Sequence, residues 1–161
     1  MATKEPANNS ETKSLEGKYL TFILNNEEYG LEILKVREII GVMDITPVPQ
    51  TPPFIKGIIN LRGKVIPVVD LRLKFVMPEI EYTKETCIIV VDISNRLMGI
   101  IVDTVSEVLD IAAKDIEPTP SLGSDIKTDF ILGMGKIKGK VKILLDIDRV
   151  LTLNELALIA S

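Results

Sequence analysis

Residues 57–75 read GIINLRGKVIPVVDLRLKF, and this stretch sets the class of fold. Two apolar runs, 58–61 and 65–71, flank a tight-turn sequence, RGK, at 62–64. Short apolar runs that are joined by such a turn predict a β-hairpin rather than a helix.

A second copy of this hairpin lies further along the chain. A shift of 76 positions aligns these pairs: Phe54 with Phe130, Gly57 with Gly133, Gly63 with Gly139, Lys64 with Lys140, and Asp70 with Asp146. Chance matching of apolar segments is the alternative, but glycines, a phenylalanine and an aspartate in the same order favour an internal duplication.

The segments that precede the two hairpins repeat as well. A shift of 69 positions aligns Asn26 with Asn95, Gly30 with Gly99, Val36 with Val105, and Glu38 with Glu107. The sequence therefore predicts two pseudo-symmetric β subdomains of roughly five strands each, at about 18–80 and 81–150. A unit of about 55 residues is marginal alone, so we expect the two to interlock around a shared core, by strand exchange for example, and to leave a groove at their seam.

The two ends of the chain differ from this β pattern. Residues 1–17 are polar and mixed in charge, which predicts a disordered tail. Residues 148–160 are apolar and favour helix, with Asp148 as the predicted N-cap. The expected fold is mainly β, with a short C-terminal helix.

Composition restricts the function. The 161 residues include no histidine and one cysteine, Cys87, which lies in an apolar run, so the commonest general base, most zinc sites and disulfides are excluded. The net charge of −4 argues against nucleic-acid binding, and no segment resembles a signal peptide or a membrane span. We expect a cytoplasmic protein without cofactor or metal.

Two kinds of function stay open on the residues alone. Asp70, Asp146 and Asp148 would suit a metal-dependent enzyme if their carboxylates converged, although a strand end followed by a helix cap is the simpler interpretation. No residue pattern indicates a catalytic site. The other function is partner binding. Arg62 would project from a hairpin tip toward a partner, although a solvated turn arginine is the alternative. Val36 would form an apolar contact surface for a partner helix, with Glu38 at its edge, although core packing is the alternative.

The residues also resemble a known family. EEYGLEILKVREI at 27–39, NLRG with PVVDLR inside 60–72, GIIVDTVSEVL at 99–109 and IEPTP at 116–120 are similar to the CheW family of chemotaxis adaptors. The resemblance covers about residues 18–159. It implies two intertwined, five-stranded SH3-like barrels.

The resemblance also implies a function, which is that of a non-catalytic scaffold that couples transmembrane chemoreceptors to the histidine kinase CheA. Such a protein would be recruited to receptor clusters at the membrane without inserting into it. The implied receptor-binding groove contains Ile33, Val36, Glu38, Ile39, Arg62 and Val108. The implied region for the regulatory domain of CheA contains Gly57, Asn60, Leu61, Arg62 and Gly63, and a second array contact maps to Glu117 and Leu122.

Overall fold

The computed structural model describes residues 15–120, 128–152 and 155. Its strands, short helix and 3-10 turns are, in chain order: β1 (Gly17–Leu24), β2 (Glu27–Glu32), η2 (Ile33–Lys35), β3 (Val36–Gly41), β4 (Ile55–Leu61), β5 (Lys64–Asp70), α2 (Leu71–Lys74), β6 (Cys87–Ile93), β7 (Arg96–Val102), β8 (Thr104–Ile111), η3 (Ala113–Asp115), β9 (Ile116–Glu117), β10 (Ile131–Ile137), β11 (Lys140–Leu145) and η4 (Ile147–Arg149). The chain is mainly β, as predicted.

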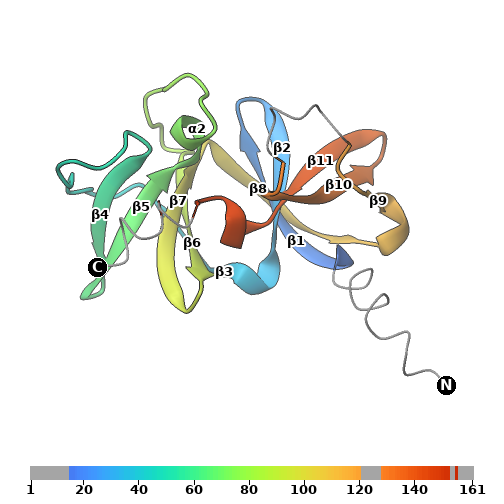
Figure 1. Cartoon of the computed structure of the whole chain (residues 1–161), viewed down its shortest axis with the longest axis horizontal. Coiled ribbons are helices and arrows are strands. Elements are labelled where there is room, and N and C mark those ends of the chain that lie inside the picture. Colours follow the sequence, from blue (N-terminus) through green and yellow to red (C-terminus); the bar gives the residue numbers. More distant parts are fainter. Residues whose placement is uncertain (1–14, 121–127, 153–154, 156–161) are drawn as a thin grey trace.

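The strands form two sheets that lie side by side (Figure 1). One sheet has the order β3-β6-β7-β5-β4, and the other has the order β8-β1-β2-β11-β10-β9. Each sheet therefore takes a hairpin from the opposite half of the sequence. The predicted exchange of strands is confirmed, whereas the repeat boundaries at about 18–80 and 81–150 stay a prediction.

The duplication appears in the strand register. Val68 of β5 pairs with Gly99 of β7 in one sheet, and Leu144 of β11 pairs with Gly30 of β2 in the other, both in parallel. A shift of 76 positions forward takes Val68 to Leu144, and a shift of 69 positions back takes Gly99 to Gly30. The first pair therefore maps onto the second. Identical pairing at equivalent positions shows that the sequence repeat is a structural repeat.

The hairpin turns follow from local sequence. Both central residues of the turn have positive φ at Asn25-Asn26, Arg62-Gly63, Ser94-Asn95 and Lys138-Gly139. Two-residue type I′ turns require this conformation, which asparagine and glycine adopt at little cost. The four long hairpins of the described chain are thus set by their turns.

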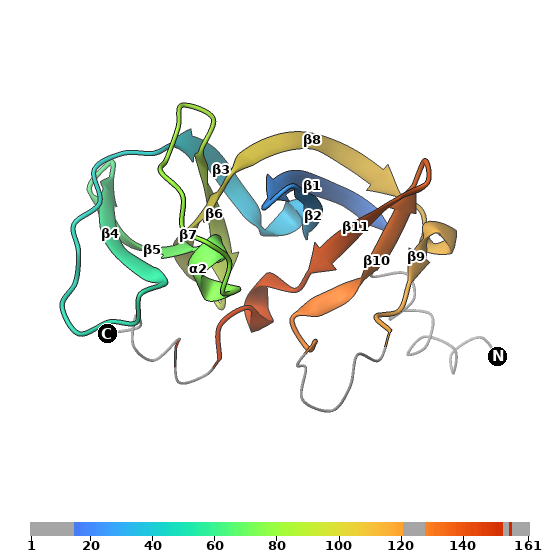
Figure 2. The same ribbon diagram turned by 90° about the horizontal axis from the view of Figure 1, so that it is seen from above.

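Each sheet is closed by the segment that follows its outer strand. After β3, Thr46 exchanges two backbone hydrogen bonds of 2.9 Å with Ile58 of β4. After β8, η3 leads to β9, where Glu117 pairs with Met134 of β10. Both closures are consistent with two small, intertwined barrels of the SH3-like type. Figure 2 shows β8 spanning from one sheet to the other.

The apolar core has three parts. One cluster fills the five-stranded barrel around Ile59 and Ile88, and a small one fills the other barrel around Tyr19 and Leu144. The largest cluster joins residues from both sheets, including Leu31 and others of β1, β2, β5, β6, β7 and β11. The predicted sharing of a core is confirmed.

The ends of the domain differ in detail from the sequence prediction. Residues 1–14 lie outside the described residues, but Gly17 already belongs to β1, because it pairs with Ile111 of β8. The Tyr19 hydroxyl also donates to the Leu15 carbonyl over 2.5 Å. At the other end, Asp148, the predicted N-cap of a helix at 148–160, lies inside the 3-10 turn η4, whose own N-cap is Asp146. Most of the predicted helix at 148–160 lies outside the described residues.

Two described residues of this segment, Thr152 and Glu155, contact each other reciprocally. The Thr152 hydroxyl accepts from the Glu155 backbone N–H over 3.1 Å, and the Glu155 carboxylate accepts from the Thr152 N–H over 2.8 Å. This reciprocal pair is a capping box, which places the N-cap at Thr152.

Candidate functional site

The candidate site is centred on β3 and on the tip of the β4–β5 hairpin. A bulge between Val36 and Glu38 interrupts the pairing of β3 with β6. Bulges re-aim the side chains beside them. Here Ile39 becomes exposed, while Val36 keeps its contact with the largest core cluster.

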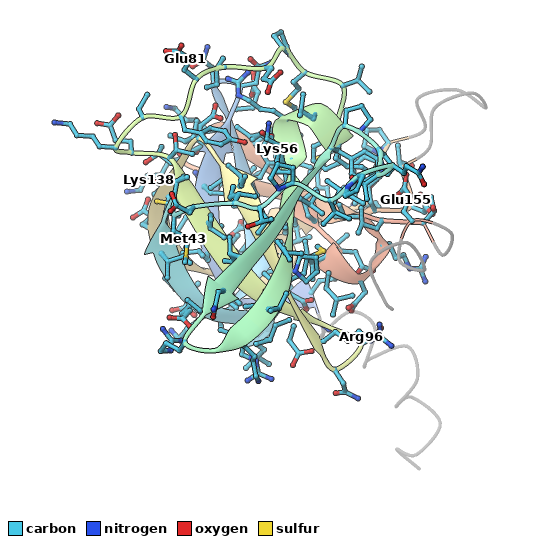
Figure 3. The ribbon with its side chains drawn as sticks, turned by 90° about the vertical axis from the view of Figure 1, so that its left-hand side faces the viewer. Met43, Lys56, Glu81, Arg96, Lys138 and Glu155 are labelled. Carbon is cyan, nitrogen blue, oxygen red and sulfur yellow. The ribbon has the colours of Figure 1, made fainter. Side chains whose placement is uncertain are left out.

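Arg62 projects from the hairpin tip, as the sequence predicts. The turn is fixed because the Asn60 side-chain oxygen accepts from the Gly63 N–H over 2.8 Å. The Arg62 side chain is 69% exposed and donates from Nη2 to Oε2 of Glu38. Figure 3 looks onto this end of the molecule, with the β4–β5 hairpin in front.

The pairing of Glu38 with Arg62 joins β3, one outer strand of the five-stranded sheet, to the turn that follows β4, the other outer strand. Closure of the barrel brings β3 and β4 together, although the two residues are 24 positions apart in sequence. The equivalent residues of the second barrel, Glu107 and Lys138, form no ion pair in the described part of the structure. The charged pair is therefore a property of the first barrel and not a requirement of the fold.

The apolar residues of the predicted receptor groove occupy two sheets. Ile33 lies in η2 and packs, with Val36, against the largest core cluster. Ile39 is exposed on β3, and Val108 is exposed on β8 at the equivalent position of the repeat. The structure thus brings Glu38 into contact with Arg62 in the five-stranded sheet, and places Val108 on the six-stranded sheet.

The predicted kinase-binding region is the β4–β5 hairpin itself. Asn60, Arg62 and Gly63 are exposed, and Leu61 is half-buried. Gly57 is buried beneath the backbone of Thr46, so its role in the isolated chain is in barrel closure.

The second predicted array contact is described only in part. Glu117 lies in β9, and its Oε2 accepts from the Lys136 ammonium group over 2.8 Å. This contact raises the pKa of Lys136. Leu122 lies outside the described residues.

Two of the three carboxylates that a metal-dependent enzyme would use act as caps, and the third, Asp148, pairs with Lys35. Asp70 accepts from the backbone N–H groups of Arg72 and Leu73, and Asp146 accepts from that of Asp148. Among the described residues, no group of three His, Cys, Asp or Glu side chains is arranged to hold a metal ion. The convergence of carboxylates that a metal-dependent enzyme would require is not present among the described residues. No helix among those residues is long and apolar enough to cross a membrane.

Sequence reasoning did not identify two cavities. One of about 330 Å³ lies between the turn after α2 and the start of β10, and is lined by Tyr29, Lys74, Phe75, Val76, Met77, Phe130, Ile131 and Ile143. The other, of about 510 Å³, lies beside η2 and is lined by Leu34, Lys35, Asp92, Ser94, Asn95 and Asp148. For the first cavity, the sequence offered one signal, which is that Phe130 repeats Phe54. The other lining residues come from segments that only the fold brings together.

Electrostatic contacts surround the second cavity. The Lys35 ammonium group donates to Asp148 Oδ2 over 2.7 Å, and this hydrogen bond raises the pKa of Lys35. Arg37 pairs with Asp92 over 2.5 Å, which lowers the pKa of that carboxyl group. Burial raises the pKa of Glu32 nearby. The cavity therefore has a mixed lining, in which the charged side chains of Lys35, Asp92 and Asp148 lie beside apolar Leu34.

Comparison with known proteins agrees with this geometry. The chain is similar to the chemotaxis protein CheW of Klebsiella aerogenes, with 42% identity over 88% of this chain and 86% of the relative. It is also similar to that of Rhizobium meliloti, with 37% identity over 84% of this chain and 88% of the relative. The crystal structure of the scaffolding protein TtCheW from Thermoanaerobacter tengcongensis superposes with a TM-score of 0.80 at 40% identity, covering 87% of this chain and 95% of that one.

The match to a family model covers both barrels. The model for the CheW-like domain matches residues 18–155, which include the strands of both sheets and the candidate site on β3, β4, β5 and β8. The chain belongs to the family of CheW-like domains.

Proposed function

We propose that this protein is a non-catalytic scaffold that couples transmembrane chemoreceptors to the histidine kinase CheA and supports the assembly of receptor arrays. The observation that carries the proposal is membership of the CheW-like family across residues 18–155. Relatives of comparable length are named chemotaxis proteins, and the similar crystal structure is titled a scaffolding protein. A scaffold works by offering surfaces to two partners, which here adjoin at Arg62, and it needs no cofactor.

The proposed receptor-binding surface combines apolar contact with one cation. Ile33, Val36, Ile39 and Val108 supply apolar area, which suits the apolar face of a helical receptor tip. Arg62 has five donors, and among the described residues one of them, at Nη2, contacts Glu38. The remaining donors are free to bind a carboxylate of the partner in a planar, charge-assisted manner.

The proposed kinase-binding surface is the rigid tip of the β4–β5 hairpin. Asn60 fixes the turn through Gly63, and Leu61 and Arg62 are presented beside it. A fixed turn loses little conformational entropy when a partner binds. Gly57 supports this surface from below, and Glu117 with Leu122 would provide the second array contact.

The proposed location follows from these partners. The protein would act in the cytoplasm, at the cytoplasmic tips of the chemoreceptors, and would reach the membrane through them rather than by insertion.

The test is co-purification of the full chain with the regulatory domain of CheA and a soluble fragment of a chemoreceptor tip. Arg62→Ala should lose receptor binding and keep the melting temperature of the wild type, because an exposed hairpin-tip arginine contributes little to stability. Lys138→Ala is the matched control, since Lys138 is the equivalent hairpin cation of the second barrel.

Val36→Asp tests the apolar part of the same surface. The folded variant should bind the receptor fragment more weakly, because a carboxylate would replace an apolar contact. Val141→Asp, at an exposed valine of the second barrel, is its control. Receptor binding that survives both Arg62→Ala and Val36→Asp in folded proteins would refute the proposed surface.

A further inference from the structure

The described chain passes from one sheet to the other at two points, and each point leads into a strand of the proposed receptor-binding surface. The first crossing is η2, between β2 and β3, and β3 carries Val36 and Ile39. The second crossing is Asp103, between β7 and β8, and β8 carries Val108. The two crossings therefore determine where these apolar side chains stand.

An ion pair anchors the second crossing firmly. Arg72 donates from Nε to Oδ1 of Asp103 over 2.8 Å and from Nη2 to Oδ2 over 2.9 Å. The backbone N–H of Asn25 also donates to Asp103, over 2.8 Å. The Arg72 and Asp103 side chains are only 11% and 19% exposed. A bidentate pair of this kind is strong and geometrically specific.

The first crossing is anchored by a related salt bridge, although only one of its two residues is at an equivalent position of the repeat: the counterpart of Asp103 is Leu34, one residue before Lys35. Lys35 of η2 contacts Asp148 over 2.7 Å. Asp148 lies 76 positions after Arg72, which is the offset of the repeat, and both residues follow a capping aspartate. Each post-strand turn therefore makes a salt bridge to a crossing, with the cation on the turn in one case and on the crossing in the other.

The first anchor is the weaker of the two. Its side chains are 34% and 38% exposed, and it consists of one contact. The turn η2 has no buried residue and no side-chain cap, and the cavity of about 510 Å³ lies beside it. Lys35 is also the cation that faces the carboxylates of Glu32, Asp146 and Asp148. Besides the packing of Ile33 against the largest core cluster, the contact of Lys35 with Asp148 is the side-chain interaction that holds η2 in the described structure.

We propose that Lys35 is a positioning residue, which holds η2 and the start of β3 in the orientation that receptor binding needs. Arg72 has the corresponding role at the start of β8. The part of this inference that concerns receptor binding rests on the proposed function, whereas the holding of η2 does not. The simpler alternative is an ordinary surface ion pair that has no effect on the turn.

The test compares Lys35→Met, Lys35→Arg and the wild type in the full chain. Methionine keeps the apolar stem without the charge, and arginine restores the charge. Lys136→Met is the control, because Lys136 also makes one contact of 2.8 Å, with Glu117, but within a single sheet. The first readout is hydrogen exchange of the Val36 amide, whose N–H donates to the Ile33 carbonyl across η2.

In Lys35→Met, the Val36 amide should exchange roughly fivefold faster than in the wild type at unchanged melting temperature. The affinity for a chemoreceptor tip fragment should fall by a similar factor, and Lys35→Arg should restore both. Exchange that is unchanged in Lys35→Met would overturn the proposal, as would faster exchange with unchanged affinity. If the wild type itself does not bind the fragment, the proposed function fails, and the exchange rates alone decide whether Lys35 holds η2.

Discussion

Gly57 lies where the chain after β3 closes the five-stranded barrel. A Cβ atom at this position would lie 2.0 Å from the carbonyl oxygen of Thr46, and the φ angle of Gly57 is +144°. At the equivalent Gly133, a Cβ atom would lie 2.9 Å from the carbonyl oxygen of Glu117. Each barrel therefore requires a glycine at its closure, which explains why the repeat preserves this residue.

Gly57→Ala should lower the free energy of unfolding by about 3 kcal/mol or more, because the obstacle is backbone that cannot rotate away. Gly41→Ala is the control, since no atom lies within 4 Å of its added Cβ. Urea unfolding followed by circular dichroism measures both. Equal stability of the two variants would contradict the close approach at Thr46.

The three tyrosines of the chain are held neutral by the fold. Burial raises the pKa of Tyr82, and so does the hydrogen bond that the Tyr82 hydroxyl donates to Asp70 over 2.8 Å. Burial raises the pKa of Tyr29, and it raises the pKa of Tyr19 to about 12. When the pKa of a tyrosine is higher in the folded than in the unfolded state, its contribution to stability is fully present at a pH below the unfolded-state pKa. The contribution is lost as the pH rises from the unfolded-state pKa through the folded-state pKa.

The wild type should therefore lose stability as the pH rises above about 10, the ordinary pKa of tyrosine. Tyr82→Phe should lose stability less steeply, because only two tyrosines then resist ionisation. Urea unfolding at pH 8 and at several values up to 11.5 gives the two slopes. Parallel slopes would mean that Tyr82 ionises as readily in the folded protein as in the unfolded chain.

At the scale of elements, α2 ends in an unusual way. The N–H of Met77 donates to the Arg72 carbonyl over 2.7 Å, and the N–H of Val76 donates to the Leu73 carbonyl over 3.1 Å. This is a Schellman motif, whose left-handed position is normally glycine. Here Val76 occupies it, with a φ of +59° and a side chain that is 89% exposed. A β-branched residue in this conformation is strained.

Val76→Gly should raise the free energy of unfolding by about 1 kcal/mol, because relief of the strain exceeds the entropy that glycine loses on folding. Val65→Gly should instead lower it by about 1 kcal/mol, since Val65 is an exposed valine with ordinary strand geometry. Thermal unfolding of the two variants provides the comparison. A destabilised Val76→Gly would show that the valine side chain contributes contacts that outweigh its backbone strain.

The elements differ in how far sequence could predict them. Hairpins were predictable because a turn such as Arg62-Gly63 acts locally. The pairing of Glu38 with Arg62 was not, because it depends on the curvature that closes the barrel. Near the C-terminus, sequence could not distinguish Asp148 from Thr152, because both are good capping residues and only the fold shows that Thr152 accepts from the Glu155 N–H.

At the scale of the whole molecule, the exchange of hairpins makes the two barrels interdependent. The β1–β2 hairpin belongs to the six-stranded sheet but is joined through η2 to β3 of the other sheet. The largest core cluster takes Leu31 from one sheet and Ile100 from the other. Neither barrel can lose its core without exposing this common cluster.

We therefore expect the two barrels to unfold as one cooperative unit, and Leu144→Ala tests this. Leu144 is fully buried in the small cluster of the six-stranded barrel, so the truncation should cost about 2–5 kcal/mol. If the unit is cooperative, native-state hydrogen exchange of Val90 in β6, in the other barrel, should report the same loss of free energy as Leu20 in β1. Independent barrels would leave Val90 at its wild-type protection. The shared cluster argues for the first result, because its residues in β6 and β7 lose their partners when β1, β2 and β11 separate.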